Sequence, residues 1–149
     1  MKIIKANVED LPKILDLQYL AFESEAILLN DYNIQPLKQT LDEVKEEFNS
    51  GIILKAIDEN NNIIGSIRSS LKNKTLFVAK LIVHPKYQNK GIGRALLYEI
   101  EKYSDFERAE LYTSSKSAKN LNLYEQVGYR KFKEEGTAGD YKFVYMEKI

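Results

Sequence analysis

A single strand-to-helix junction constrains the fold of this chain more than any other segment. An apolar strand that ends at Val83 is followed by a short polar loop, and Gly91 and Gly93 then open directly into a helix with apolar residues on one face. This order requires a β-α unit in the second half of the chain. The first backbone N–H groups of a helix have no partner within the helix and carry partial positive charge, so the junction is suited to hold an anion.

The residue types in this loop favour a phosphate group as that anion. Gly91 and Gly93 place no Cβ atom where an anion must approach, so the backbone amides of residues 88–94 can surround a pyrophosphate. Lys90 and Arg94 add positive charge nearby. The spacing lacks the third glycine of the dinucleotide-binding fingerprint and the Gly-Lys-Ser/Thr of a P-loop. A strand-to-helix turn that binds no ligand is the alternative interpretation.

Length and composition are those of one globular domain. The 149 residues are expected to form a single domain over residues 1–149. The 22 Lys and Arg residues balance the 22 Asp and Glu residues, which argues against a nucleic-acid partner. No apolar run reaches the length of a membrane span and the N-terminus lacks a signal-peptide core, so a cytoplasmic protein without a membrane partner is expected. With no cysteine and His84 as its one histidine, the chain predicts no metal site.

Hydrophobic periodicity and turn residues predict alternating strands and helices. Strands are expected over residues 1–6, 52–58, 63–71, 75–83, 109–113, 129–134 and 141–147, and helices over residues 9–22, 41–48, 91–103 and 117–127. Thr40 and Glu43 form the pattern of a capping box at the start of the second helix. Short polar turns at 60–62 and 72–74 join neighbouring strands as antiparallel hairpins. Residues 23–39 follow no regular pattern and are expected to connect the first two helices.

Two motifs on these elements are similar to the signatures of a known family. The run Gln88–Gly93 matches the Gln/Arg-x-x-Gly-x-Gly/Ala loop that binds the pyrophosphate of acetyl-CoA in the GNAT superfamily of N-acetyltransferases. Residues 123–129 match its second signature, Leu-Tyr-Glu-x-x-Gly-Tyr. With the element order, these motifs give the whole chain a resemblance to this superfamily. The resemblance implies an α/β (α+β) GNAT-like fold, with a central, mostly antiparallel mixed sheet of about seven strands and about four helices, splayed between strands 4 and 5 with the help of a bulge.

The resemblance also implies acetyl-CoA as cosubstrate and no metal. The pantetheine arm would lie between the fourth and fifth strands like a missing strand, and backbone groups near Leu81, Ile82 and Val83 would bond to its amides. One of these N–H groups would stabilise the oxyanion that forms when an amine attacks the thioester. The residues that would contact the cofactor are Leu81, Ile82, Val83, Gln88, Asn89, Lys90, Gly91, Gly93, Arg94, Asn120 and Tyr124.

Tyr124 is the catalytic residue that the resemblance implies. A phenol held near the sulfur can donate a proton to the coenzyme A thiolate as it leaves. Asn120 lies one helical turn earlier on the same face and is expected to contact the cofactor arm. Without the motif, Tyr124 would be interpreted as a core residue of an amphipathic helix and Asn120 as an ordinary polar one.

The sequence does not identify the general base that would take a proton from the attacking amine. Several GNAT enzymes carry a glutamate on the fourth strand, but residues 75–83 contain no Asp or Glu. The carboxylates that remain as candidates are Glu23, Glu25, Asp31, Glu110 and Asp140, and a water relay is the other option.

The resemblance implies direct acetyl transfer to a primary amine of a small molecule or peptide, and it leaves the acceptor open. Residues 23–39, the strand around Arg68 and the loop 136–140 are expected to form the acceptor pocket. The acidic residues of the first segment would favour a cationic amine, whereas Arg68 would pair with a substrate carboxylate. A second hypothesis, motivated by the missing glutamate, is a non-catalytic acyl-CoA-binding sensor or regulatory module. Dimerisation is common in the family, so the resemblance also offers a homodimer, and the sequence does not decide the oligomeric state.

Overall fold

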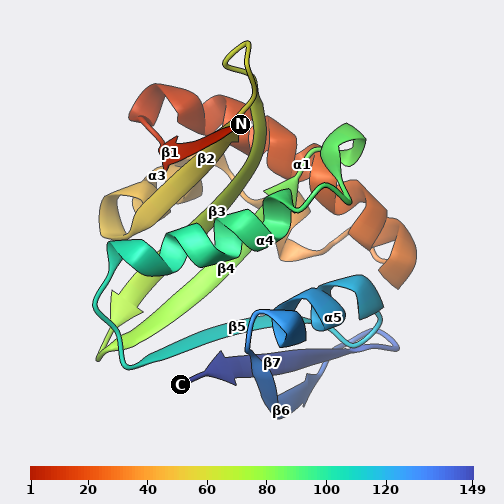
Figure 1. Cartoon of the computed structure of the whole chain (residues 1–149). Coiled ribbons are helices and arrows are strands. Elements are labelled where there is room, and N and C mark those ends of the chain that lie inside the picture. The colour runs from red at the N-terminus through yellow and green to blue at the C-terminus, as the bar shows by residue number, and fades with distance from the viewer.

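The computed structural model describes residues 1–149, and its centre is a seven-stranded sheet in the order β1-β2-β3-β4-β5-β7-β6 (Figure 1). The strands are β1 (Lys2–Lys5), β2 (Ile52–Ile57), β3 (Ile63–Lys72), β4 (Thr75–Val83), β5 (Arg108–Ser114), β6 (Arg130–Gly136) and β7 (Lys142–Lys148). All neighbouring strands are antiparallel except β4 and β5, which are parallel. The predicted mixed, mostly antiparallel sheet is confirmed.

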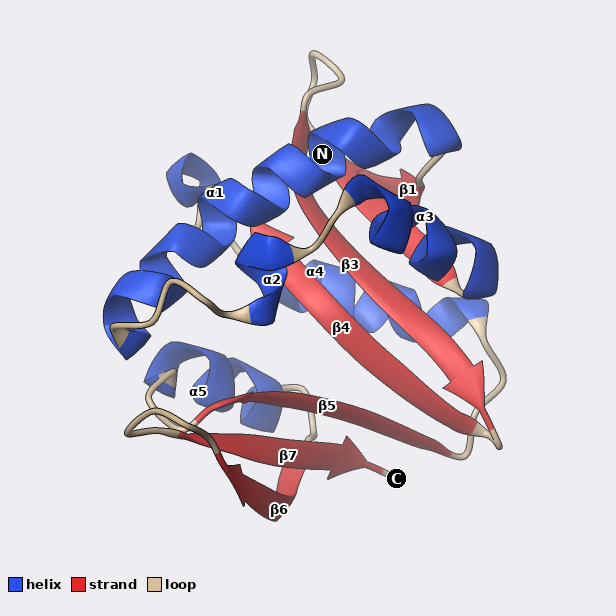
Figure 2. Ribbon diagram, turned by 180° about the vertical axis from the view of Figure 1, so that it is seen from behind, coloured by secondary structure: helices blue, strands red, loops and turns tan.

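Helices cover both faces of this sheet. They are α1 (Leu11–Leu29), α2 (Gln35–Lys38), α3 (Leu41–Ser50), α4 (Ile92–Ile100) and α5 (Ala118–Gln126), with single 3-10 turns at Val8–Asp10, Pro85–Tyr87 and Glu101–Tyr103. Figures 1 and 2 show α4 and α5 on one face and α1, α2 and α3 on the other. The largest core lies under α4 and α5 and includes the fully buried Leu96 and Ile100. A smaller core holds α1 and α3 to the opposite face through Leu11 and Val44.

The sheet opens into a fork between β4 and β5. These strands pair only where Thr75–Phe77 lies beside Arg108–Glu110, and they then diverge (Figures 1 and 2). The register of β4 against β3 shifts between Ser66 and Arg68, and Lys80 within the shifted part of β4 has a φ of 53°. This is a β-bulge, which bends a strand and increases its twist. The predicted splay between strands 4 and 5, with a bulge beside it, is confirmed.

The first helix is longer than the sequence predicted, which corrects the placement of two acidic residues. It runs to Leu29, so Glu23 and Glu25 lie on α1 rather than in a connecting segment. Asn30 ends the helix in the left-handed conformation with φ 49°, and its N–H bonds to carbonyl groups of the last turn. The end of α1 is held by a small core that Leu29 shares with Tyr141, which lies between β6 and β7.

The second and third helices differ from expectation in one respect. The capping box of α3 forms as predicted, with the Glu43 N–H 3.3 Å from Thr40 Oγ1 and the Thr40 N–H 2.9 Å from Glu43 Oε1. The four-residue α2 was not predicted, because the segment around Pro36 has no helical periodicity long enough to detect. The molecule therefore has five α-helices where about four were expected.

A buried polar network fixes the segment between α1 and α3. Arg68 on β3 is only 3% exposed. Its Nη2 donates to Gln18 Oε1 at 2.6 Å, and its Nη1 donates to Gln39 Oε1 at 3.0 Å and Glu47 Oε2 at 3.2 Å. Burial lowers the pKa of Arg68, and the Glu47 carboxylate opposes this shift. The expectation that Arg68 pairs with a substrate carboxylate is therefore wrong, since these protein groups already hold its terminal nitrogens.

Gly51 allows α3 to end against β3 at a distance that no other residue permits. A Cβ atom on Gly51 would lie 2.1 Å from the backbone carbonyl oxygen of Ser69. Gly51→Ala is therefore expected to lower the free energy of unfolding by about 3 kcal/mol, because one of the two backbones must shift. Urea denaturation measures this change. Gly136→Ala is the matched control, since no atom lies within 4 Å of its Cβ position; similar losses for both variants would contradict the steric explanation.

Candidate active site

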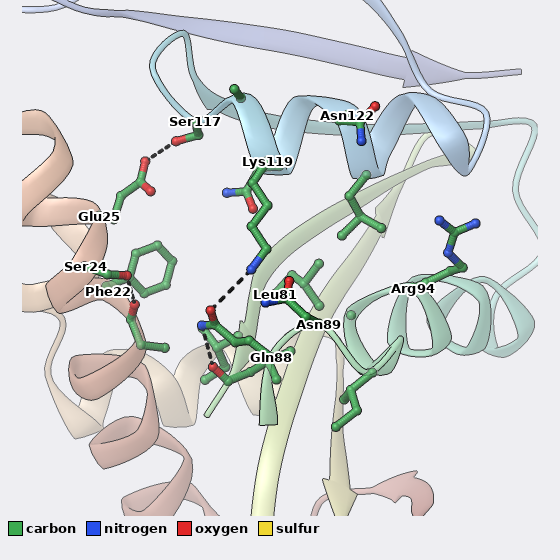
Figure 3. A pocket seen from close by; sticks show the side chains of 18 of the residues that line it. Phe22, Ser24, Glu25, Leu81, Gln88, Asn89, Arg94, Ser117, Lys119 and Asn122 are labelled. Carbon is green, nitrogen blue, oxygen red and sulfur yellow. Dashed lines mark hydrogen bonds between the residues drawn. The ribbon is translucent and has the colours of Figure 1, made fainter. Parts of the chain in front are cut away.

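A cavity of about 810 Å³ lies beside the open end of the fork (Figure 3). It is bounded by the second half of α1, the end of β4, the glycine loop with the start of α4, and α5. The predicted cofactor-contacting residues that line it are Leu81, Ile82, Val83, Gln88, Asn89, Gly91, Gly93, Arg94 and Asn120. Lys90 and Tyr124 are not part of the lining. The structure therefore brings the strand end, the loop and the second motif to one space.

The glycine loop exposes the N-terminus of α4 to this cavity. Gly91 is the N-cap of α4 and has a φ of 83°, a conformation that L side chains rarely adopt. No atom lies within 4 Å of its Cβ position, so the backbone is open to a ligand there. The Cβ position of Gly93 faces the protein instead, 3.4 Å from Leu123 Cδ2. Lys90 lies with its ammonium 5.5 Å from the centre of the Tyr87 ring.

Positive side chains approach the cavity from two helices. Arg94 on α4 and Lys119 on α5 both line it (Figure 3). Arg94 donates a hydrogen bond to Gln126, and Lys119 donates to Gln88 Oε1 at 3.3 Å. The Nε2 of Gln88 donates to the Val83 carbonyl at 3.3 Å, which ties the loop to the end of β4. Lys119 was not predicted, and its position in the first turn of the motif-bearing helix is the only sequence signal for it.

Tyr124 lies on α5, outside the lining of the cavity, and is 7% exposed. Burial raises the pKa of its phenol far above the ordinary value, and the negative charge of Glu25 raises it further. Its ring packs edge-on against Tyr129, with 6.3 Å between the ring centres. One turn earlier, Asn120 faces the cavity and its Nδ2 donates to Thr113 Oγ1 at 3.4 Å. The Tyr124 phenol is therefore kept neutral beside the site.

Glu25 is the one carboxylate in the lining of the cavity. Its Oε1 accepts a hydrogen bond from Ser114 Oγ at 3.0 Å. The same oxygen accepts another from Ser117 Oγ (Figure 3). The two serines are themselves in contact, with 2.6 Å between their hydroxyl oxygens. The bridge joins α1 to the end of β5 and the start of α5. The sequence had offered Glu25 only as one of several acidic residues, and it gave no sign of the two serine partners.

The remaining carboxylates that were considered as bases do not line the cavity. Their surroundings are as follows: Glu23 is exposed on α1, Asp31 accepts from the Tyr141 hydroxyl at 3.1 Å, Glu110 pairs with Arg108 at 2.8 Å, and Asp140 pairs with Lys116 at 2.8 Å. No cluster of three or more His, Cys, Asp or Glu side chains that could hold a metal ion is present. None of the helices combines the length and the apolar character that crossing a bilayer requires.

Comparisons with known proteins place this chain in a family. Residues 26–149 match the family described as the acetyltransferase (GNAT) domain. The UPF0157 protein YqkA of Bacillus subtilis is 28% identical over 120 residues, which cover 80% of this chain and 34% of YqkA. The uncharacterized protein YdhI of the same organism is 31% identical over 78 residues, which cover 50% of this chain and 48% of YdhI. The matches thus span a third to a half of these relatives.

A solved structure shows the same fold. The PaiA N-acetyltransferase from Thermoplasma acidophilum, in complex with coenzyme A, superposes with a TM-score of 0.82 at 18% identity, covering 99% of this chain and 97% of that protein. The family match over residues 26–149 shows that the chain belongs to the GNAT acetyltransferase family. The resemblance predicted from the two motifs is confirmed.

Proposed function

We propose that the protein transfers the acetyl group of acetyl-CoA directly to a primary amine of a small molecule or peptide. The cavity carries this proposal, because it joins the open N-terminus of α4 to the unpaired edge of β4 at the fork. The first feature suits a pyrophosphate and the second suits the amide-bearing arm of coenzyme A. No covalent acyl-enzyme is required, because a bound amine can attack the thioester itself.

The donor would lie along β4. Residues 78–83 have no strand partner on the β5 side, so their backbone N–H and C=O groups on that edge are available to the pantetheine amides. One N–H near Leu81 would face the thioester carbonyl and stabilise its developing negative charge. Arg94, Lys119 and the amides around Gly91 would hold the phosphates. Lys90, outside the lining, would add only longer-range attraction.

Tyr124 would act as the general acid at the other end of the reaction. When the tetrahedral intermediate collapses, the C–S bond breaks and the sulfur leaves as a thiolate that needs a proton or a hydrogen bond. A tyrosine phenol is protonated at neutral pH, and the raised pKa of Tyr124 keeps it protonated to higher pH. Tyr124 also follows Asn120, which lines the cavity, by one helical turn, and this spacing supports a role for Tyr124 beside the cofactor arm.

Thiol release tests the proposed reaction. Acetyl-CoA is mixed with the protein and with a panel of polyamines, amino acids, peptides and aminoglycosides, and free coenzyme A is measured with a thiol reagent while calorimetry measures donor binding. Turnover with at least one amine is expected, with acetylation of its nitrogen verified by mass. Tight binding of acetyl-CoA without turnover on any amine would support the sensor hypothesis instead.

The conformation of Gly91 predicts a selective loss of donor affinity. Gly91→Ala is expected to raise the Kd for acetyl-CoA about tenfold, because the left-handed conformation costs an alanine about 1 kcal/mol and the new methyl group enters the space reserved for the anion. Calorimetric titration of both proteins measures the change. Gly136→Ala, also free of neighbouring atoms but remote from the cavity, should bind like the wild type. Equal affinities for all three proteins would remove Gly91 from the donor site.

A further inference from the structure

We propose that Glu25 is the general base of this site and the residue that selects a cationic amine, an inference that rests on the proposed acetyl transfer. The fourth strand supplies no carboxylate, and Glu25 is the one acidic side chain that lines the cavity. The other charged side chains of the lining are Arg94, Lys116 and Lys119, all positive. Glu25 is therefore the only side chain of the lining that attracts an ammonium group, and the other charged side chains repel it.

The hydrogen bonds of Glu25 leave half of its carboxylate free. Both serine hydroxyls donate to Oε1, and no side chain or backbone group donates to Oε2. Ser114 and Ser117 are only 3% and 4% exposed. Oε1 therefore faces the protein interior, and the two hydrogen bonds fix the orientation of the carboxylate. Figure 3 shows the Glu25 carboxylate between α1 and α5 with its second oxygen unengaged. A carboxylate held by one oxygen can accept a proton with the other.

Ser117 does not make the hydrogen bond that is usual for its position. It occupies the N-cap position of α5, where a serine side chain normally accepts a hydrogen bond from a backbone N–H of the first turn. Here it makes no such bond, and its hydroxyl donates to Glu25. A helix without its cap is about 1 kcal/mol less stable. Departures of this kind from local stability are typical of functional sites.

Glu25 and Tyr124 are linked through α5. Glu25 accepts a hydrogen bond from Ser117, the N-cap of α5, and Tyr124 follows on the same helix about two turns later. Glu25 itself lies on α1 in the lining of the cavity, and its negative charge contributes to the raised pKa of the Tyr124 phenol behind that lining. A base for the incoming amine and an acid for the leaving thiolate would thus come from two different helices.

With Glu25 as base and Tyr124 as acid, the protons and electron pairs of the acetyl transfer balance. The acceptor enters as an ammonium and loses one proton to Glu25 Oε2, and the nitrogen lone pair forms a C–N bond to the thioester carbon. The C–S bond breaks with its electron pair on sulfur, and the thiolate takes the proton of Tyr124. The new amide nitrogen returns a proton to the phenolate, and Glu25 releases its own to solvent. The products are an N-acetyl amine, coenzyme A thiol and one proton.

Glu25→Gln tests the inference, since glutamine still accepts the serine hydrogen bonds but takes no proton. At pH 7 we expect kcat/KM for the amine to fall about 100-fold, the usual contribution of a general base. Only the free amine would react with this variant, so its rate should rise about tenfold per pH unit toward the amine pKa near 10. Glu25→Asp should keep the wild-type shape of the pH profile at a lower kcat, and the exposed Glu23→Gln should match the wild type.

The outcomes separate this inference from the proposed function. A Glu25→Gln variant that turns over like Glu23→Gln, or that loses activity equally at every pH, would overturn the role of base while acetyl transfer stands. A matching loss of acetyl-CoA affinity, measured by calorimetry, would assign Glu25 to donor binding and would also overturn it. Wild-type protein that binds acetyl-CoA but acetylates no amine would overturn the proposed function, and the assignment of Glu25 with it.

Discussion

Tyr124→Phe is expected to lower kcat about 100-fold, and at least tenfold, while the Kd for acetyl-CoA changes less than twofold. The substitution removes one oxygen atom, which makes no hydrogen bond to another protein group. The ring and its packing against Tyr129 remain. The loss should therefore fall on the step in which sulfur leaves, and the stability of the fold should be preserved. Steady-state thiol release with calorimetric donor binding separates the two effects.

The pH dependence of the wild type follows from the same residue. Burial and the charge of Glu25 raise the pKa of Tyr124 above its ordinary value. A raised pKa means that the acid form persists to higher pH, so the rate should show no decline from loss of this proton between pH 7 and pH 10. Tyr98→Phe, at an exposed tyrosine of α4, is the control and should leave kcat unchanged. An unchanged kcat in Tyr124→Phe would exclude the general-acid role.

Arg68→Ala is expected to lower the free energy of unfolding by about 3 kcal/mol. The substitution removes a guanidinium that is hydrogen-bonded to three residues. They are Gln18 of α1, Gln39 of the segment before α3, and Glu47 of α3. These groups would lose their partner in a region where Gln18 is fully buried and Gln39 is 4% exposed. An unpaired buried polar group costs more than the hydrogen bond contributes when it is made. The segment between the end of α1 and the start of α3 should become more mobile as well.

Urea denaturation of the wild type, Arg68→Ala and Arg130→Ala measures the loss of stability expected for Arg68→Ala. Arg130→Ala on β6 removes an exposed arginine and should change the free energy of unfolding by less than about 0.5 kcal/mol. A loss below 1 kcal/mol in Arg68→Ala would mean that water replaces the guanidinium in the network and that the segment is held by its apolar contacts alone.

Local patterns predicted the parts of the molecule that local physics determines. The hairpins over β2, β3 and β4 follow from alternation and short polar turns, and α4 follows from its glycine junction and its apolar face. The end of α1 was missed because Glu23 and Glu25 interrupt the apolar pattern. Glu25 is polar where the helix borders the cavity and Glu23 is exposed to solvent, so neither adds to the apolar pattern by which a helix is predicted.

Long-range polar contacts could not be predicted from the sequence, for a different reason. Glu25 meets Ser117 across 92 positions of the chain, and Arg68 meets Gln18 across 50. Each of these residue types is ordinary at an exposed position, so nothing in its neighbours shows that it is paired. The motifs correctly located the glycine loop, whereas the choice among the acidic residues depended on which one the fold turns toward the cavity.

The fork has a consequence for the order in which substrates bind. Tyr124 belongs to the part of the molecule built on β5, β6 and β7, whereas Glu25 is carried by α1, which packs on β3 and β4. β4 and β5 pair only where Thr75–Phe77 lies beside its neighbour, and the gap beyond that pairing is the space that a donor bonded to β4 would fill. A donor in this gap would become one wall of the space that is left for the amine. We therefore expect an ordered mechanism, in which the amine meets a complete binding site only after acetyl-CoA has bound.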